Sequence, residues 1–230
     1  MITLLTYPRA FGQYSGSPFC TKAAQFLKLS GVQWRREDML DPRKMPFQKL
    51  PVIRTEGTLI ADSDSIRSYL EAQGAQFDEG LSDIDKSTSR AFIRMAEEHI
   101  YFHVLLDRWG DDAMWPVLRD TYFQAIPWIM RNFVANSIRK TVLKGMHTQG
   151  LGRLSEQDRL ARIEPDLDAV TTRLWQNRFL FGDKPTAADA SVGPMISAAV
   201  ARPNPSALSQ RIKENAVLMG YVERIDGLLD

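Results

Sequence analysis

The sequence predicts an α/β domain over residues 1–75, followed by an all-α domain over residues 88–230, with a linker over 76–87 between them. In the first part, short β-rich runs alternate with helical patterns. The linker sequence QFDEGLSDIDKS is polar and acidic and contains a glycine, as is typical of a connection. Beyond it, apolar residues recur at spacings of three and four, which is the period of one helical face.

Turn and cap residues mark the ends of the elements expected in the α/β part. Pro18 suits the first turn of a helix. The pair Glu56-Gly57 between two β-rich runs indicates a hairpin. Ser63 is the expected N-cap of the last helix, and Gly74 ends it. The expected order is strand, helix, strand, irregular stretch, hairpin and helix, over residues 2–7, 18–31, 32–37, 38–50, 51–62 and 63–74.

The all-α part begins with a helix whose apolar face runs from Phe92 to Trp109. Pro116 and Pro127 would kink or divide the helix that follows, because proline lacks the N–H group that an inner helical turn uses. The further helices are expected over residues 113–145, 156–177, 187–201, 206–214 and 217–229.

Composition excludes several classes of protein. A net charge of +1 and a hydrophobic fraction of 44% are ordinary for a soluble globular protein and give no reason to expect a nucleic-acid partner. One cysteine excludes an internal disulfide and a cysteine-based metal cluster. The N-terminus lacks the basic region and cleavage site of a signal peptide, and no apolar run approaches the ~20 residues that cross a bilayer. We therefore expect a cytoplasmic protein with no membrane span.

The segment SPFC places a serine and the cysteine at the expected start of a helix. A thiolate held near Ser17 would meet free backbone N–H groups and the positive end of the helix dipole, and both would lower its pKa. The Ser17 hydroxyl would donate to that thiolate. Cys20 lies one turn into the helix, where it is either a redox thiol or a small buried apolar side chain.

Two further segments have both a ligand-binding and a purely structural interpretation. In QKLPVI, a cis Leu50-Pro51 bond would leave the backbone N–H and C=O of Leu50 free to pair with an extended peptide ligand, whereas a trans proline would simply open a strand. In ADSDSIRSYLE, Asp62 and Ser63 lie at a helix N-terminus. They suit the head group of an amino acid, or they cap the helix.

Taken in this order, these motifs resemble those of the glutathione S-transferase superfamily. Residues 1–73 resemble its thioredoxin-like N-terminal domain through SPFC, KLPVI and IADSDSIRSYL. The helical remainder is similar to its C-terminal domain, and FLFGDKPTAADASVGPMI resembles the folding motif in which Thr186 and Asp189 form a capping box. The segments SPFCTKAAQFLKLSGV, DPRKMPFQKLPVI, RMAEEHIYFHVLLDRW and HTQGLGRLS are similar to the branch that contains metaxins, failed-axon-connections proteins and their bacterial relatives.

The resemblance implies the glutathione transferase fold, in which the thioredoxin-like domain binds glutathione and the helical domain walls the site of a hydrophobic electrophile. Ser17 would contact or activate the glutathione sulfur. The other glutathione-binding residues that the resemblance implies are Leu50, Pro51, Asp62, Ser63, and Arg43 or Lys44. The residues implied for the electrophile pocket are Glu98, His99, Phe102, Arg108 and Trp109. Dimers are common in the superfamily, and a homodimer remains open.

Departures from the family pattern keep other hypotheses open. Members that exchange thiols have a cysteine at the Ser17 position, and this chain lacks it. Tyr7, near the end of the first strand, and Tyr14, in the long loop after it, are alternative residues for activating the thiol. The metaxin branch includes interaction or import components, so a non-catalytic interaction module is the alternative to a glutathione transferase. A redox sensor at Cys20 is the third hypothesis.

A pair of histidines raises the question of a metal site. His99 and His103 are four residues apart on a predicted helix, a spacing that can bind zinc. No HExxH glutamate lies between them, and both belong to the apolar face. We therefore expect them to pack in the structure or line a groove, and we expect no metal.

Residues 121–155 contain no Asp or Glu. Their cations would suit an acidic partner or a membrane surface. Cations near the C-terminal end of a long helix are also favoured by the helix dipole, and we favour this second explanation. The cations in question are Arg131, Arg139, Lys140, Lys144 and Arg153.

Overall fold

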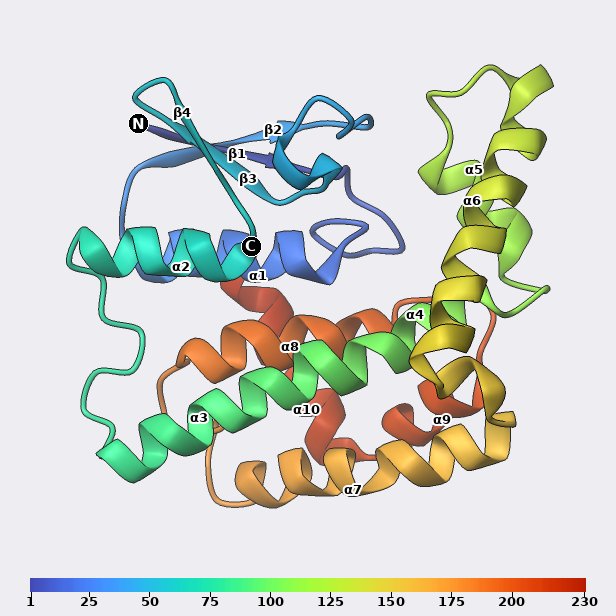
Figure 1. Cartoon of the computed structure of the whole chain (residues 1–230). Helices are drawn as coiled ribbons and strands as arrows, with labels where there is room; N and C mark the ends of the chain where they lie inside the picture. Colours follow the sequence, from blue (N-terminus) through green and yellow to red (C-terminus); the bar gives the residue numbers. More distant parts are fainter.

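A computed structural model describes residues 1–230. The N-terminal lobe consists of β1 (Ile2–Thr6), α1 (Pro18–Leu29), β2 (Trp34–Asp38), β3 (Val52–Thr55), β4 (Thr58–Ala61) and α2 (Ser63–Ala72). The strands form one sheet in the order β2-β1-β3-β4. β1 and β2 are parallel, and β3 is antiparallel to both β1 and β4. Helices α1 and α2 lie together along one face of this sheet (Figure 1).

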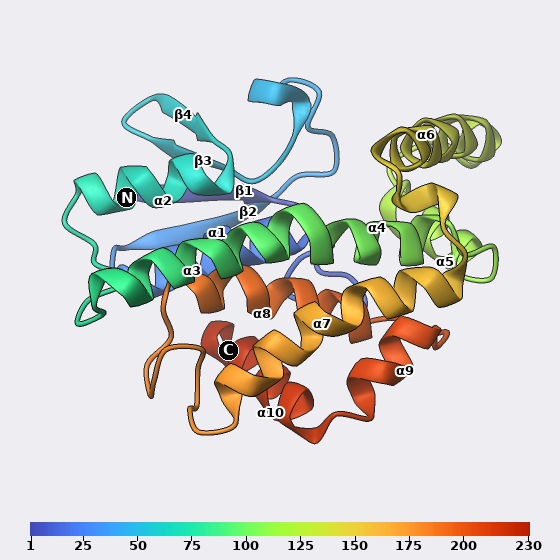
Figure 2. The ribbon, with the colours of Figure 1, turned by 60° about the horizontal axis from the view of Figure 1, so that its bottom comes forward.

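The C-terminal lobe is helical. Its elements are α3 (Asp83–Met95), a π-helical turn η2 (Ala96–Ile100), α4 (Tyr101–Trp109), α5 (Trp115–Tyr122), α6 (Trp128–Gln149), α7 (Glu156–Leu174), α8 (Ala187–Val200), α9 (Ala207–Lys213) and α10 (Ala216–Asp226). Short 3₁₀ turns occur at η1 (Pro46–Gln48), η3 (Leu151–Arg153) and η4 (Gly227–Leu229). α8 lies next to α1, and α7, α9 and α10 lie on its far side (Figures 1 and 2).

The predicted fold class is confirmed, with local corrections to element ends. Asp62, not Ser63, is the N-cap of α2, because its carboxylate accepts from the backbone N–H groups of the first turn. α3 begins at Asp83 with Ser82 as its N-cap, so this helix starts inside the predicted linker 76–87. Pro127 is the N-cap residue of α6, which explains why the helix predicted over 113–145 is divided.

Both lobes share one continuous apolar core. Phe26 of α1 and Ile66 of α2 belong to the same buried cluster as Ile93 of α3 and Tyr221 of α10. The central helix, α8, is buried along almost its whole length. The two lobes therefore pack against one another, and this shared core fixes the side chains that lie between them.

The capping box predicted at the start of α8 is present. Asp189 is fully buried and accepts from the backbone N–H of Thr186 at 2.8 Å and from the Thr186 hydroxyl at 2.8 Å. It also accepts from the Leu180 N–H at 2.9 Å and from the Tyr221 hydroxyl at 3.0 Å. One carboxylate thus joins the helix start, the loop before it and α10.

A buried ion-pair network also joins the lobes. Lys22 of α1 is fully buried, and its Nζ lies 2.6 Å from Asp64 Oδ1 of α2. The same ammonium group pairs with Glu97, which belongs to η2 in the other lobe. Arg94 of α3 pairs with both of these carboxylates.

Candidate active site

The start of α1 carries the serine predicted to activate a thiol. Ser17 is the N-cap residue, with extended backbone (φ −117°, ψ 125°), and its side chain makes no capping hydrogen bond. Pro18 follows in the first turn, so its missing N–H costs the helix nothing. The half-buried Ser17 hydroxyl is therefore not used to cap the helix, and it lies beside the Cys20 thiol at the helix N-terminus.

A cluster of hydroxyl groups surrounds the only cysteine. Cys20 is fully buried. Burial raises the pKa of its thiol, and hydrogen bonds from the Tyr7 backbone and the hydroxyls of Thr6, Ser17 and Ser15 offset this only in part. The Ser15 hydroxyl also donates to the Tyr7 carbonyl at 2.9 Å and lies 3.2 Å from Thr6 Oγ1. The sequence analysis missed Ser15, which fixes the loop that leads to α1.

The two candidate tyrosines occupy different surroundings. Tyr7 packs against the small cluster that contains Cys20, and burial, the largest effect, raises the pKa of its hydroxyl to about 12. Tyr14 packs against the main core, with the Arg36 guanidinium 4.2 Å from its ring centre. Its hydroxyl is buried and makes no hydrogen bond. Tyr7 is therefore the tyrosine beside Cys20, and it stays protonated at neutral pH.

The loop before β3 supplies two free backbone groups. The Leu50-Pro51 bond is cis. Leu50 is 6% exposed and packs in the same cluster as Cys20. Its backbone N–H and C=O make no hydrogen bond within the chain. Since buried backbone groups are nearly always paired, this edge is suited to an added strand from a ligand.

The N-terminus of α2 lies next to this loop, because the Asp62 N–H donates to the Pro51 carbonyl at 3.2 Å. Asp62 Oδ1 accepts from the N–H groups of Asp64 at 2.9 Å and Ser65 at 3.3 Å. The capping interpretation is thus confirmed for Asp62. Its other carboxylate oxygen has no partner within the chain, and neither has the hydroxyl of Ser63, which is 3% exposed.

The two basic residues proposed for a carboxylate differ in availability. Arg43 is 82% exposed and forms a two-pronged pair with Asp41, with Nε–Oδ1 at 2.8 Å and Nη2–Oδ2 at 2.7 Å. These hydrogen bonds hold the pKa of Asp41 at about 2. Lys44 is exposed and makes no ion pair. Of the two, Lys44 is the cation that remains available to a ligand.

Aromatic residues of the C-terminal lobe close over the start of α1. The Tyr122 hydroxyl of α5 donates to the Gly16 carbonyl at 2.7 Å. A Cβ on Gly16 would lie 3.1 Å from the Tyr122 ring, so the two groups approach each other closely. Phe19 makes an edge-to-face contact with Tyr101 of α4, with ring centres 4.8 Å apart. Neither Tyr101 nor Tyr122 was identified from the sequence, because both lie far from SPFC along the chain.

Comparisons with known proteins identify the family to which the chain belongs. Residues 18–114 match the glutathione S-transferase N-terminal domain, and residues 163–225 match the glutathione S-transferase C-terminal domain. The isoprene-epoxide–glutathione S-transferase of Rhodococcus sp. (strain AD45) is 31% identical, over 98% of both chains. The chain belongs to the glutathione S-transferase family.

More distant similarities fit the branch that the motifs indicated. Human metaxin-2 is 22% identical over 79% of this chain and 70% of its own. The failed axon connections protein of Drosophila melanogaster is 27% identical over 79% of this chain and 46% of its own. The glutathione transferase GSTFuA3 of Phanerochaete chrysosporium superposes with a TM-score of 0.67 at 16% identity, covering 100% of this chain and 97% of its own. That last likeness concerns the fold alone.

In this chain, the five residues predicted for an electrophile pocket do not all lie together. His99 Nδ1 lies 2.5 Å from Asp166 of α7. Glu98 is 64% exposed and pairs with Arg94. Phe102 packs with the cluster around η3. These three side chains are therefore directed to partners other than Ser17.

The remaining two predicted pocket residues do lie near the start of α1. Arg108 is 5% exposed, donates to the Tyr122 hydroxyl at 3.2 Å, and its guanidinium lies 5.5 Å from the Phe11 ring centre. Trp109 stacks in the same aromatic cluster, with its ring centre 6.3 Å from that of Tyr122. An aromatic wall of Phe11, Trp109 and Tyr122 thus borders the SPFC turn.

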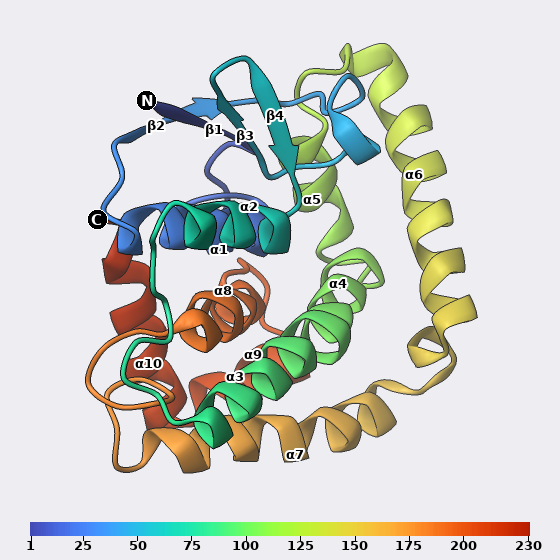
Figure 3. The same ribbon diagram turned by 60° about the vertical axis from the view of Figure 1, so that its left-hand side comes forward.

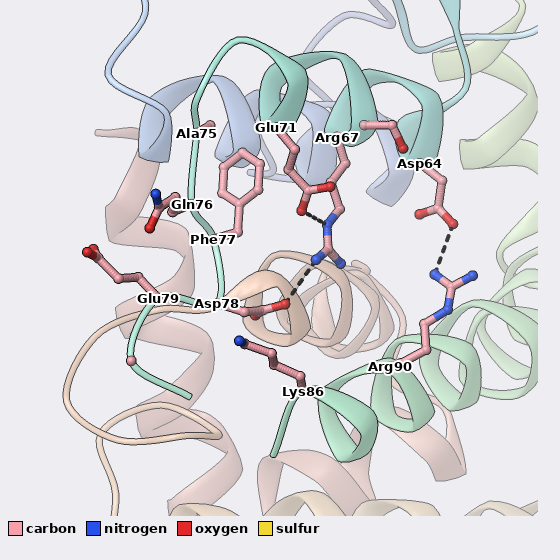
Figure 4. Close-up of a pocket in the computed structure, with 12 residues that line it drawn as sticks. Asp64, Arg67, Glu71, Ala75, Gln76, Phe77, Asp78, Glu79, Lys86 and Arg90 are labelled. Atoms are coloured by element: carbon pink, nitrogen blue, oxygen red, sulfur yellow. Dashed lines mark hydrogen bonds and ion pairs between the residues drawn. The ribbon is translucent and has the colours of Figure 1, made fainter. Parts of the chain in front are cut away.

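A separate cleft of about 670 Å³ lies between α2, the following loop and α3 (Figure 4). Its lining is mainly charged, and the Arg67 side chain bridges Glu71 and Asp78 across it, at 2.7 and 2.9 Å. Arg90 approaches Asp64 at the other end. Ion pairs of this kind do not suit an apolar electrophile, so we do not assign the electrophile to this cleft.

The histidine pair lies in a packed environment. His103 is 4% exposed, and its Nε2 lies 3.3 Å from His99 Nε2. Burial first, and then the nearby His99, lower the pKa of His103 to about 3. Groups of three or more His, Cys, Asp or Glu side chains arranged to hold a metal ion are absent from the structure.

Proposed function

We propose that this chain binds glutathione and transfers its thiolate to an apolar electrophile. The observation that carries the proposal is the unpaired backbone of Leu50, which is nearly buried and packs in the same cluster as Cys20 at the start of α1. An extended peptide that pairs with Leu50 would bring a cysteinyl sulfur toward Ser17. The 31% identity to a glutathione S-transferase over the full chain supports the same conclusion.

The chain's own groups suggest a division of roles along glutathione. The hydroxyl of Ser17, which makes no capping bond, and the helix N-terminus would stabilise the thiolate, and Tyr7 is the alternative donor. Asp62 and Ser63 would hold the γ-glutamyl end, where a carboxylate oxygen and a hydroxyl are unpartnered. Lys44 would take the glycyl carboxylate.

The substrate class that best fits is a small apolar epoxide. The Rhodococcus relative carries isoprene epoxide in its name, and an aromatic wall suits an apolar substrate. In the proposed step, the thiol proton leaves to solvent and the thiolate forms a C–S bond with one epoxide carbon. The C–O bond of that carbon breaks, and the resulting alkoxide takes a proton from solvent, so glutathione and epoxide combine without a leaving group.

The test is conjugation of glutathione with isoprene epoxide by the wild type, S17A and Y7F, with S137A as the matched control on an exposed serine. We expect S17A to lower turnover about ten- to hundredfold, since a hydrogen bond to a charged group contributes ~1.5–3 kcal/mol. Glutathione affinity by calorimetry should hardly change. Turnover by S17A equal to that of S137A would contradict the role of Ser17. A loss of turnover in Y7F would then assign the donor to Tyr7.

The non-catalytic alternative rests on the metaxin similarity at 22% identity. It predicts neither conjugation nor a thiolate absorbance band when glutathione is added at millimolar concentration. A redox sensor at Cys20 fits less well, because a reactive thiol is exposed and has a lowered pKa, whereas Cys20 has neither property. A cytoplasmic location and a homodimer remain predictions.

A further inference from the structure

The N-terminal part of α6 exposes a group of large apolar side chains. Trp128, Ile129, Met130 and Phe133 are 78%, 74%, 56% and 78% exposed. Single exposed apolar residues are normal on a protein surface, and those on the other elements are of this kind. Four within six consecutive positions form a patch, and such patches mark interaction sites.

Three of the four patch residues lie on the outer side of the helix, whereas Trp128, the first residue of α6, has the angular position of the inner side. At 100° per residue, Ile129, Met130 and Phe133 fall on the side opposite to Ala135 and Met146, which are buried against the rest of the lobe. Helix α6 runs along the edge of the molecule, and no other element lies beyond it (Figures 2 and 3). Nothing in the chain therefore covers these side chains.

Two lysines lie further along the same outer side of α6. Lys140 and Lys144 follow Phe133 by two and three helical turns on that side. Both are exposed, and neither forms an ion pair. Arg139, on the inner side, donates to the Trp109 carbonyl at 2.8 Å and pairs with Asp112 at 2.7 Å. The inner cation thus serves the fold, whereas the outer ones have no partner within the chain.

The helix dipole accounts for only part of this pattern. It favours a cation near the last turns of α6, as at Lys144, but it does not explain exposed apolar residues at the first turns. The absence of Asp and Glu from residues 121–155 means that no acidic group on this helix reduces its positive charge.

We propose that the outer face of α6 docks on the surface of a membrane that contains anionic lipids. The residues that form this face are Ile129, Met130, Phe133, Lys140 and Lys144. Apolar side chains that enter the headgroup boundary, together with lysines that attract anionic headgroups, are the combination that interfacial helices use. No helix in the chain has the length and apolar character that crossing a bilayer demands. The helix would therefore lie on the surface.

A second copy of the chain is a poorer occupant of this face. If two α6 helices met, each would bring Lys140 and Lys144 to a surface that has no carboxylate to receive them. Like charges would then approach one another as the apolar residues became buried.

The test is co-sedimentation with vesicles of phosphatidylcholine alone and with added phosphatidylglycerol. The wild type should bind the anionic vesicles and bind more weakly as salt rises. K140Q/K144Q should lower the partition coefficient about 25-fold, at about fivefold per lysine. I129S/F133S should lower it as well. Matched controls are K184Q/K213Q and I84S, which change exposed residues away from α6 and should bind as the wild type does.

These substitutions fall on exposed side chains, so circular dichroism should show the native fold in each variant. Wild-type protein that fails to bind anionic vesicles overturns the proposal. Binding that neither α6 variant weakens overturns it as well, because another surface must then be responsible. A concentration-dependent dimer that F133S abolishes, without vesicle binding, would assign the face to a second copy instead.

Discussion

Replacing Lys22 by methionine should destabilise the protein strongly, because this lysine is buried between the lobes. Its side chain is fully buried, with Nζ 2.6 Å from Asp64 Oδ1 and paired also with Glu97. Methionine has a similar length and keeps the packing of the stem, so the substitution removes mainly the charge. Glu97, which is 6% exposed, would lose its partner from α1.

The expected loss is about 3 kcal/mol of unfolding free energy. Removing one member of a buried ion pair costs ~3–5 kcal/mol, since it leaves the other charge uncompensated. Here Arg94 still lies 3.1 Å from Glu97 Oε2, which favours the lower end of that range. For a chain of this size, ~3 kcal/mol corresponds to a fall of about 6–12 °C in the melting temperature.

The assay is thermal and urea unfolding of K22M, E97Q and the double variant. K28M is the matched control, because Lys28 is an exposed lysine on the same helix. The double variant should lose less stability than the sum of the single ones, by ~1–3 kcal/mol, since either change alone breaks the same pair. A K22M melting temperature equal to that of K28M, or strict additivity, would show that the pair between the lobes contributes nothing.

Two further predictions concern buried groups of the C-terminal lobe. D189A should cost about 3–5 kcal/mol in urea unfolding, because two backbone N–H groups and two hydroxyls lose their common acceptor, and D189N should cost less. His103 has its pKa lowered from 6.5 to about 3, so the unfolded chain binds this proton at a higher pH than the folded one. The unfolding free energy should therefore fall as pH drops from about 6.5 toward 3, by up to ~1.4 kcal/mol per pH unit. Urea unfolding of wild type and H103Q over this pH range is the test. An unfolding free energy that does not change with pH in either protein would contradict the prediction.

Sequence patterns predicted the parts of the fold that short-range signals determine. Pro18 at a helix start, Glu56-Gly57 in a hairpin and the Thr186–Asp189 box all depend on residues a few positions apart, and each was found as expected. Ser15 and Tyr122 were missed because their contacts depend on the path of a loop and on an element more than a hundred residues away.

The residues expected for the electrophile pocket lie apart for a related reason. The family resemblance implied them for the helix that follows the linker, and the sequence analysis counted one helical face along that helix through residues 92–109. The π-helical turn η2 interrupts that count, because a π turn holds about one residue more than an α turn. The faces of α3 and α4 therefore do not follow a single 3.6-residue period. His99, which lies in η2, is directed to Asp166 of α7.

The hydroxyl cluster bears on which group of the SPFC turn does chemistry. Burial keeps the Cys20 thiol protonated, and the hydroxyls beside it are not sufficient to reverse that. The Ser15 hydroxyl is also used within the fold, since it donates to the Tyr7 carbonyl and accepts from the Ser17 N–H. These bonds fix the loop just before α1. The Ser17 hydroxyl makes no capping bond to the backbone of α1 and has only the neutral Cys20 thiol beside it, so it is the group in this turn that an incoming thiolate can use.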